Sequence, residues 1–491
     1  MGSPYMLWLR GRGKDRERKV GAQAAPAANS RRCHGPCVSP FFWGSGSLGN
    51  RVFGILASSS PLVVGRRRSE EIKNERRVEE MTSEELYQQV LGIRPPWRVA
   101  RVKLDKVREC VEVYLEHEGG LRWACPECGQ LHGTYDHTPE RRWRHLDSCE
   151  YATYLYARLP RVECGSHYRE IPAPWASEGG RFTLAMECWC IDTLQECDVT
   201  GAKRLTGLDW SSLWKIAERA VKRGRERKGK RLPARLGVDE KSFGRFHRYE
   251  TLVCDLEEGA VEYIAEGRKH ESLSGYFEQF SSEELAEVEV VAMDMWRPYI
   301  EAVKAVVPEP EDKIVFDRFH TMRYVTDAVD QTRRQEQKAL RQEGSDTLKG
   351  SRYLWLWNAE DVPEERRQEF ADLKTDHLRV GRAWSIKESL RDLWKQDSSD
   401  EAKDFFKRWY FWATHSRLPK MVGAAKTLKT HLAGVLNSVT KRVTNACAEG
   451  LNSKIEMVKR MSCGFRNREH YRTMVYFHCG KLDLYPAVPT S

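Results

Sequence analysis

Two aspartates are the first residues of this sequence whose positions suggest chemistry. Asp239 ends a short apolar run at residues 236–239, and Asp294 follows a second apolar run at residues 288–293. Such runs are typical of buried strands, so both carboxylates are expected at strand ends of one mixed sheet. Neighbouring carboxylates repel each other unless divalent cations lie between them, which makes a metal site the functional interpretation. An acid at a strand end is also common for purely structural reasons.

A third acid on a nearby helix would complete such a site. Residues 447–461 alternate an apolar stripe with a polar face that carries Glu449, Asn452 and Glu456 at helical spacing. Glu449 is the candidate ligand, Glu456 is its rival, and a solvated glutamate face is the structural alternative. Three carboxylates can hold two Mg²⁺ or Mn²⁺ ions, which activate a water or a 3′-hydroxyl and stabilise the leaving oxygen.

The surroundings of this helix suit phosphate groups. Residues 441–468 contain seven Lys or Arg and only two acids, a balance that favours contact with a nucleic-acid backbone. The candidate contacts are Lys454, Lys459 and Arg460.

A second kind of metal site is predicted nearer the amino terminus. Cys125 and Cys128 form one pair of ligands, and Cys164 and His167 form another. A CxxC alone is equally compatible with a redox pair, but a second pair at this distance favours one structural zinc ion bound by three thiolates and one imidazole.

Two further stretches are candidates for DNA contact. Between the ligand pairs lies a basic and aromatic stretch that suits either the DNA backbone or simple packing, with Arg141, Arg142 and Arg144. Residues 182–221 predict a helix, a short helix, a tight turn and another helix, as in a helix-turn-helix. The residues that its second helix would present to the major groove are Ser211, Ser212 and Lys215.

Length and charge distribution set limits on these interpretations. The 491 residues are enough for several domains. Residues 1–80 hold 15 Lys or Arg against 7 acids, so they account for +8 of the net charge of +10. The overall charge is therefore weak support for DNA binding, which must come from local patches. We expect residues 1–80 to be a disordered or even untranslated extension, because Met81 opens a well-patterned segment.

Composition also indicates the compartment. The longest apolar stretch, residues 52–64, is too short for a membrane span. The 14 cysteines are mostly unpaired along the chain, which is typical of reduced thiols. We therefore expect a cytoplasmic, nucleoid-associated protein with no membrane partner.

Seven segments together resemble the ISL3-type insertion-sequence transposases, over nearly all of residues 81–491. They are residues 125–129 (CPECG), 143–147 (WRHLD), 205–210 (LTGLDW), 236–240 (LGVDE), 292–295 (AMDM), 316–320 (FDRFH) and 448–455 (AEGLNSKI). The resemblance implies a DDE transposase that binds terminal inverted repeats and target DNA, with Asp239, Asp294 and Glu449 as metal ligands. It also implies that His320 contacts the scissile phosphate or orders the following helices, and a packed histidine is the alternative.

The resemblance further implies the fold, a multidomain α/β protein with a zinc finger, a helix-turn-helix and an RNase H-like mixed-sheet catalytic domain that carries an all-α insertion. The expected segments are a helix and hairpin at 81–120, a zinc module at 121–180, a helix-turn-helix at 181–225, a catalytic core at 235–330 and 441–491, and the insertion at 331–440. We expect a homo-oligomer on double-stranded DNA. The alternative function is a zinc-dependent DNA-binding regulator whose catalytic domain is inactive.

Overall fold

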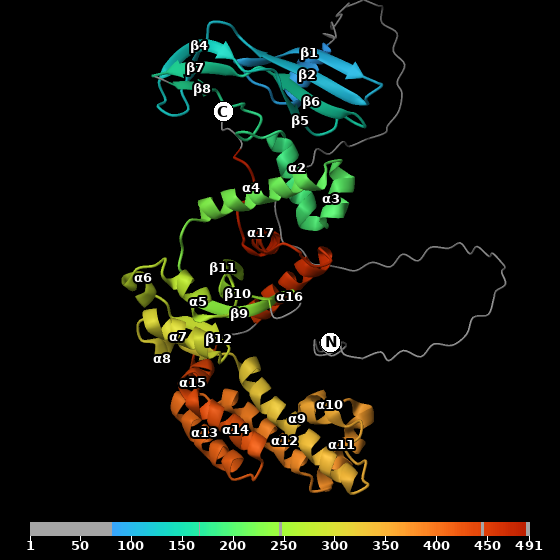
Figure 1. Cartoon of the computed structure of the whole chain (residues 1–491), viewed down its shortest axis with the longest axis vertical. Helices are drawn as coiled ribbons and strands as arrows, with labels where there is room; N and C mark the ends of the chain where they lie inside the picture. Colours follow the sequence, from blue (N-terminus) through green and yellow to red (C-terminus); the bar gives the residue numbers. More distant parts are fainter. Residues whose placement is uncertain (1–80, 166, 245–247, 443–445, 488–491) are drawn as a thin grey trace, which may run out of the picture. The chain divides into compact units, whose positions relative to one another are not determined.

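The computed structural model describes residues 81–165, 167–244, 248–442 and 446–487 (Figure 1). The expected extension at residues 1–80 lies outside the described residues. Helices and strands form a mixed α/β architecture, as expected from the sequence.

The amino-terminal part is built from two four-stranded sheets. It opens with α1 (Ser83–Val90), which begins at Thr82 through a capping box with Glu85. One sheet has the order β1-β2-β6-β5 and the other has the order β3-β4-β7-β8. Their strands are β1 (Trp97–Asp105), β2 (Cys110–His117), β3 (Arg122–Ala124), β4 (Leu131–His137), β5 (Arg141–Arg144), β6 (Ala152–Ala157), β7 (Pro160–Cys164) and β8 (His167–Glu170). The predicted hairpin is confirmed as the antiparallel pair β1 and β2.

Three helices follow, in the predicted order of helix, short helix, turn and helix. They are α2 (Leu184–Glu196), α3 (Val199–Thr206) and α4 (Trp210–Lys228). Side chains of Thr183, Asp198 and Asp209 cap their amino ends. Gly207 ends α3 with φ of 68°, a conformation that glycine adopts without strain. The α4 helix runs further than expected and includes part of the predicted basic linker.

A five-stranded sheet with the order β11-β10-β9-β12-β13 forms the next part. Its strands are β9 (Arg235–Gly244), β10 (Arg248–Asp255), β11 (Ala260–Glu266), β12 (Val290–Met293) and β13 (Ile314–Phe316). The first three are antiparallel, whereas β12 and β13 run parallel to β9. The helices between these strands are α5 (His270–Phe277), α6 (Ser282–Ala286), α7 (Arg297–Val306) and α8 (Pro310–Lys313).

One detail of the predicted strands is wrong. The strand that was expected to end at Asp239 continues to Gly244, because β10 pairs with β9 over its whole length and matches Asp239 with Leu252. Asp239 therefore lies inside a strand, and hydrogen bonds to β10 stabilise the backbone beyond it.

Residues 318–440 are helical, in agreement with the predicted all-α segment. The helices are α9 (Arg318–Gln342), α10 (Arg352–Leu356), η2 (Ala359–Asp361), η3 (Glu364–Arg366), α11 (Arg367–Thr375), α12 (Arg379–Leu390), η4 (Arg391–Lys395), α13 (Ser399–Thr414), α14 (Pro419–Thr430) and α15 (Leu432–Thr440). The chain then returns to the sheet with α16 (Ala446–Met461) and α17 (Arg468–Cys479).

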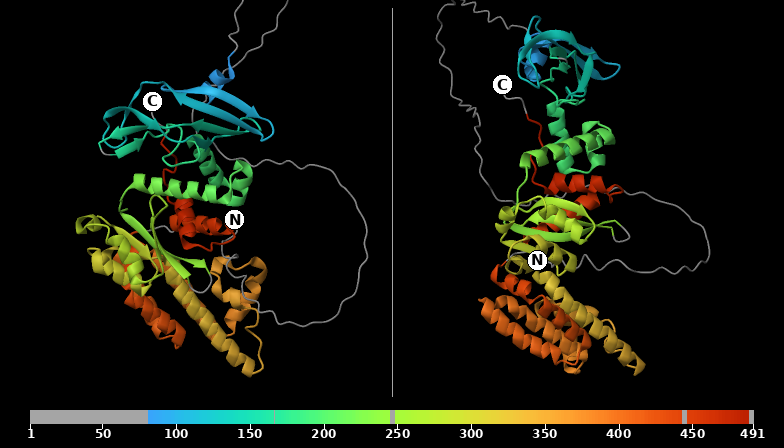
Figure 2. Two further views of the ribbon diagram at one scale, coloured as in Figure 1. Left: turned by 45° about the horizontal axis from the view of Figure 1, so that its top comes forward. Right: turned by 60° about the vertical axis from the view of Figure 1, so that its left-hand side comes forward.

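The sheet has a separate core on each face. One core contains Leu236 and Val291 and continues through α5, α7 and the helical segment after β13. The other contains Leu252 with side chains of α4, α16 and α17, such as Ile455 and Tyr471. Figure 2 shows α16 and α17 in red beside the green strands. This packing brings α16 to the sheet although about 130 residues separate it from β13 in sequence.

Candidate active site and zinc-binding cluster

Three aspartates lie at the same level on the parallel strands of the sheet. β12 pairs Ala292 with Gly237 of β9, so the register continued by two residues sets Asp294 beside Asp239. β13 pairs Phe316 with Met293, so Asp317 follows at the level of Asp294. Asp239 and Asp294 thus come together from strands far apart in sequence, as the sequence suggested.

Asp239 is held by the backbone and by two side chains. Its Oδ1 accepts a hydrogen bond of 2.7 Å from the Glu240 N–H. Its Oδ2 lies 2.9 Å from Lys241 Nζ and accepts a 2.9 Å hydrogen bond from Asn452 Nδ2 on α16. A positive charge therefore already faces the carboxylate oxygen that a cation would bind.

Asp294 has a histidine as its neighbour. His320 Nδ1 lies 3.5 Å from Asp294 Oδ2 but makes no hydrogen bond of ordinary geometry, and His320 Nε2 lies 4.0 Å from Asp317 Oδ2. Burial disfavours the charged imidazolium, but the surrounding carboxylates, Asp294 foremost, raise the pKa of His320. Burial also disfavours the Asp294 carboxylate, but His320 and the Met295 N–H outweigh it and lower the pKa of Asp294.

The helix α16 reaches the aspartates through Asn452. Glu449 lies one turn before Asn452 and is exposed. Glu456, its rival, is exposed one turn later and pairs with Lys459 at 3.0 Å. Among the described residues, the carboxylates do not form a group of three with all ligand atoms within 4.8 Å. Glu449 therefore lies on the helix that contacts Asp239, and it forms no such group with the two aspartates.

The residues fit divalent cations that prefer oxygen ligands. Partly buried carboxylates at one level, with a further carboxylate on the adjacent helix, offer the oxygen donors that Mg²⁺ and Mn²⁺ bind. Sequence reasoning missed Asp317 as a carboxylate at this level, although it also ends an apolar run, and it missed Lys241 as a partner of Asp239.

A thiol cluster lies in the amino-terminal part. The sulfur atoms of Cys125, Cys128 and Cys164 lie within 4.8 Å of one another, and Cys128 Sγ is 3.4 Å from Cys164 Sγ. Backbone N–H groups of Cys128 and Glu127 lower the pKa of the Cys125 thiol, which favours the thiolate that zinc requires. The set fits zinc with one position open. His167 is exposed on β8 and is not within this group.

The arginines of β5 already have partners within the chain. Arg141 pairs with Glu170, and Arg144 pairs with Asp147. Arg142 is exposed and its guanidinium lies 4.7 Å from the centre of the Tyr154 ring. These contacts support the packing interpretation for Arg141 and Arg144 and leave Arg142 open to an external partner.

The predicted contact residues on α4 differ in exposure. Ser211 and Lys215 are exposed. Ser212 is only 4% exposed, and its Oγ donates a 2.7 Å hydrogen bond to Asp209 Oδ2, so it serves the helix cap and is not presented to an outside ligand. On α16, Lys454 and Arg460 are exposed.

Within the described residues, none of the helices combines the length and apolar character that crossing a bilayer requires.

Comparison with known proteins finds matches to two parts of the chain. Residues 236–475 match a family model for an ISL3-type DDE transposase, described as "Transposase", and residues 121–167 match the "zinc-finger of transposase IS204/IS1001/IS1096/IS1165". The chain is 28% identical over 372 residues to the transposase for insertion sequence element IS1557 of Mycobacterium tuberculosis, covering 70% of this chain and 82% of that protein. It is 27% identical over 358 residues to the transposase for insertion sequence element IS1001 of Bordetella parapertussis, covering 71% and 86%.

The first match contains all three candidate carboxylates, and the second contains the three clustered cysteines and His167. The chain therefore belongs to the ISL3 family of transposases.

Proposed function

We propose that this transposase binds the terminal inverted repeats of an insertion sequence, cleaves the DNA strands at its ends and joins them to target DNA. The observation that carries the proposal is the common level of Asp239 and Asp294 on parallel strands, with α16 held against Asp239 by Asn452. The strand order, with three antiparallel strands followed by two parallel ones, supports an RNase H-like core.

The roles of the carboxylates follow from their positions. Asp239, Asp294 and Glu449 would hold two Mg²⁺ or Mn²⁺ ions. Bound there, the ions would activate the attacking oxygen of water or of a 3′-hydroxyl and stabilise the leaving oxygen. Asn452 orients the Asp239 carboxylate, and His320 would place its imidazole beside Asp294, where it could contact a phosphate group.

The remaining parts would position the DNA. Three thiolates, with His167 as the fourth ligand once the β7–β8 hairpin adjusts, would hold one structural zinc ion. The α3 and α4 helices would form the helix-turn-helix, with Ser211 and Lys215 reaching the major groove. Assembly of several copies on DNA would bring both ends of the element together.

Cleavage of DNA that carries the inverted repeats flanking the gene tests this proposal. Asp239→Asn, Asp294→Asn and Glu449→Gln should each slow Mg²⁺-dependent nicking by on the order of 100-fold or more, as expected when several kcal/mol of transition-state stabilisation are lost. Nicking that survives all three substitutions would overturn it.

Glu456→Gln is the matched control, since Glu456 is an exposed glutamate on the same helix whose partner is Lys459. This variant should nick DNA at the normal rate. If Glu456→Gln is inactive and Glu449→Gln is active, the third ligand is Glu456. Specific binding of the ends without nicking in Mg²⁺ or Mn²⁺ would instead indicate a DNA-binding regulator.

A further inference from the structure

The helices α13 and α14 carry most of the excess positive charge of the helical insertion. Residues 403–430 contain seven Lys or Arg and one acid, Asp404. The other 82 residues of the segment 331–440 contain 14 basic and 15 acidic residues. The charge is therefore local to this helical hairpin and does not reflect a generally basic insertion.

An exposed group of side chains at the turn of the hairpin forms what we call the hairpin patch. Its members are Lys407, Arg408, Phe411, Trp412, His415, Arg417 and Lys420, all of them exposed. In the described part of the chain, no carboxylate lies within ion-pair distance of the Lys and Arg members. Closely spaced cations without counter-charges repel one another, so this surface is suited to a polyanion.

Two aromatic rings stand among these cations. Phe411 is 64% exposed and its neighbour Trp412 is 41% exposed. The Phe411 ring stacks on His415 with centroids 4.0 Å apart. The opposite face of α13 is closed by buried Phe406 and Trp409, so the exposed rings are not needed for the core. Exposed aromatic rings that lie next to each other often mark a binding surface, whereas single exposed rings need no such explanation.

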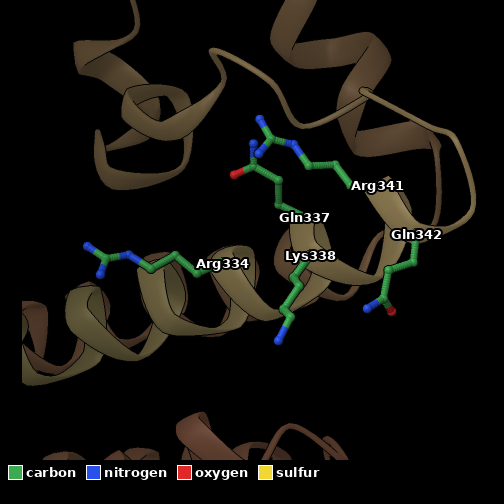
Figure 3. A pocket seen from close by; sticks show the side chains of 5 residues that line it. All are labelled: Arg334, Gln337, Lys338, Arg341 and Gln342. Carbon is green, nitrogen blue, oxygen red and sulfur yellow. The ribbon is translucent and has the colours of Figure 1, made fainter.

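The basic face of α9 differs from this patch. A hollow of about 340 Å³ there is lined by Arg334, Lys338, Arg341 and two glutamines. Figure 3 shows these side chains along the helix. Arg334 pairs with Asp330 at 2.7 Å, and Arg341 pairs with Asp346 at 3.6 Å. Both guanidinium groups thus have a carboxylate partner within the chain, which the Lys and Arg members of the hairpin patch lack, so we expect the α9 face to have less affinity for an outside anion.

We propose that the hairpin patch is a DNA-binding surface, in which the cations contact phosphates and the rings of Phe411 and Trp412 stack on unpaired or unstacked bases. This inference rests on the proposed function, since strand cleavage and joining create such bases. Phosphate contact provides affinity for any DNA, whereas aromatic stacking requires an accessible base. A second copy of the chain is a poorer partner, because symmetric docking would bring the same positive charges face to face.

Fluorescence anisotropy of the full, zinc-loaded chain in a buffer without Mg²⁺ or Mn²⁺ separates the two contributions. Replacing the cations by Lys407→Gln and Arg408→Gln should weaken binding to every DNA about tenfold or more and make the slope of log affinity against log salt shallower by about 1.8. The double variant Phe411→Ala and Trp412→Ala should lose about tenfold in affinity only for DNA with an unpaired segment, and should bind fully paired DNA normally.

The matched control removes the same charge from α9 through Arg334→Gln and Arg341→Gln, and it should bind both DNAs as the unmodified chain does. Unchanged affinity of the patch variants, or an equal loss in the α9 control, would overturn the inference. A change in oligomeric mass with unchanged DNA affinity would also overturn it and indicate a protein interface. Because these binding measurements do not depend on Mg²⁺ or Mn²⁺, absent nicking with the predicted binding changes would refute only the proposed chemistry.

Discussion

Replacing Lys241 should strengthen binding of divalent cations at the proposed active site. Lys241 Nζ lies 2.9 Å from Asp239 Oδ2, and the two side chains are only 16% and 28% exposed. A cation that binds Asp239 must displace this ammonium group or bind beside its positive charge. Lys241→Gln removes both the ammonium group that must be displaced and the charge that repels the cation, and both changes favour cation binding.

The size of the effect follows from the geometry. Unit charges 2.9 Å apart attract by about 6 kcal/mol at an effective dielectric constant of about 20. Hydration of the separated groups reduces the net value of such a charged hydrogen bond to about 1.5–3 kcal/mol. Since about 1.4 kcal/mol corresponds to a factor of ten, the affinity for Mn²⁺ should rise about 10- to 100-fold.

Titration of the full chain with Mn²⁺, followed by electron paramagnetic resonance in the absence of DNA, measures this affinity. Lys459→Gln is the control, because it removes an equal charge from α16 but its partner is Glu456 at 3.0 Å. Thermal unfolding confirms that both variants are folded. An Mn²⁺ affinity of Lys241→Gln equal to or below that of the unmodified chain would refute the competition between Lys241 and the cation.

Three further predictions concern zinc, pH and a buried ion pair. Metal analysis should find about one zinc ion per chain and none after Cys164→Ser, and zinc retained by that variant would exclude the thiol cluster as the site. Burial lowers the pKa of His145 and of His478 to about 4. Their stabilising contribution is therefore complete above the ordinary pKa of about 6.5 and is lost as the pH falls towards 4, because the unfolded chain then binds protons that the folded protein does not. Urea denaturation should show the free energy of unfolding falling by about 2 kcal/mol for each histidine between pH 7 and 5, and His145→Asn should remove the part of this fall that is due to His145. Glu250 is fully buried and lies 2.9 Å from Arg472 and 2.7 Å from Arg468. Replacing both arginines by Met should therefore lower the free energy of unfolding by about 3 kcal/mol, whereas the same two changes combined with Glu250→Gln should cost less, and equal costs would contradict the pairing.

Local sequence signals predicted most of the elements. The helix that opens the described chain and the last helix of the helix-turn-helix were both predicted, and in the structure the side chains of Thr82 and Asp209 cap them. An apolar run predicted the strand that precedes Asp294, since such runs must be buried, and a similar run forms the strand before Asp317. The spacing of Cys125 and Cys128 predicted the thiol cluster, because a tight turn brings both sulfur atoms to one side.

Long-range packing decided the features that local signals cannot encode. The strand at Asp239 was expected to stop there, but pairing with β10 carries it on to Gly244. Ser212 was expected to face DNA, but the packing of α4 leaves it only 4% exposed, and its hydroxyl donates to Asp209, the residue that caps the helix. Exposure of Phe411 likewise depends on which face of α13 packs inward, and helical spacing alone does not decide between the two faces.

The candidate site depends on both kinds of information. The sequence by itself determined that Asp239 and Asp294 each belong to an apolar strand, because burial of such runs is a local property. Only the tertiary structure decided that they lie level with each other and that Asn452 reaches Asp239. The two aspartates are 55 residues apart, and Asn452 is more than 200 residues from Asp239. Strand register and helix docking over such separations depend on how side chains pack throughout the chain.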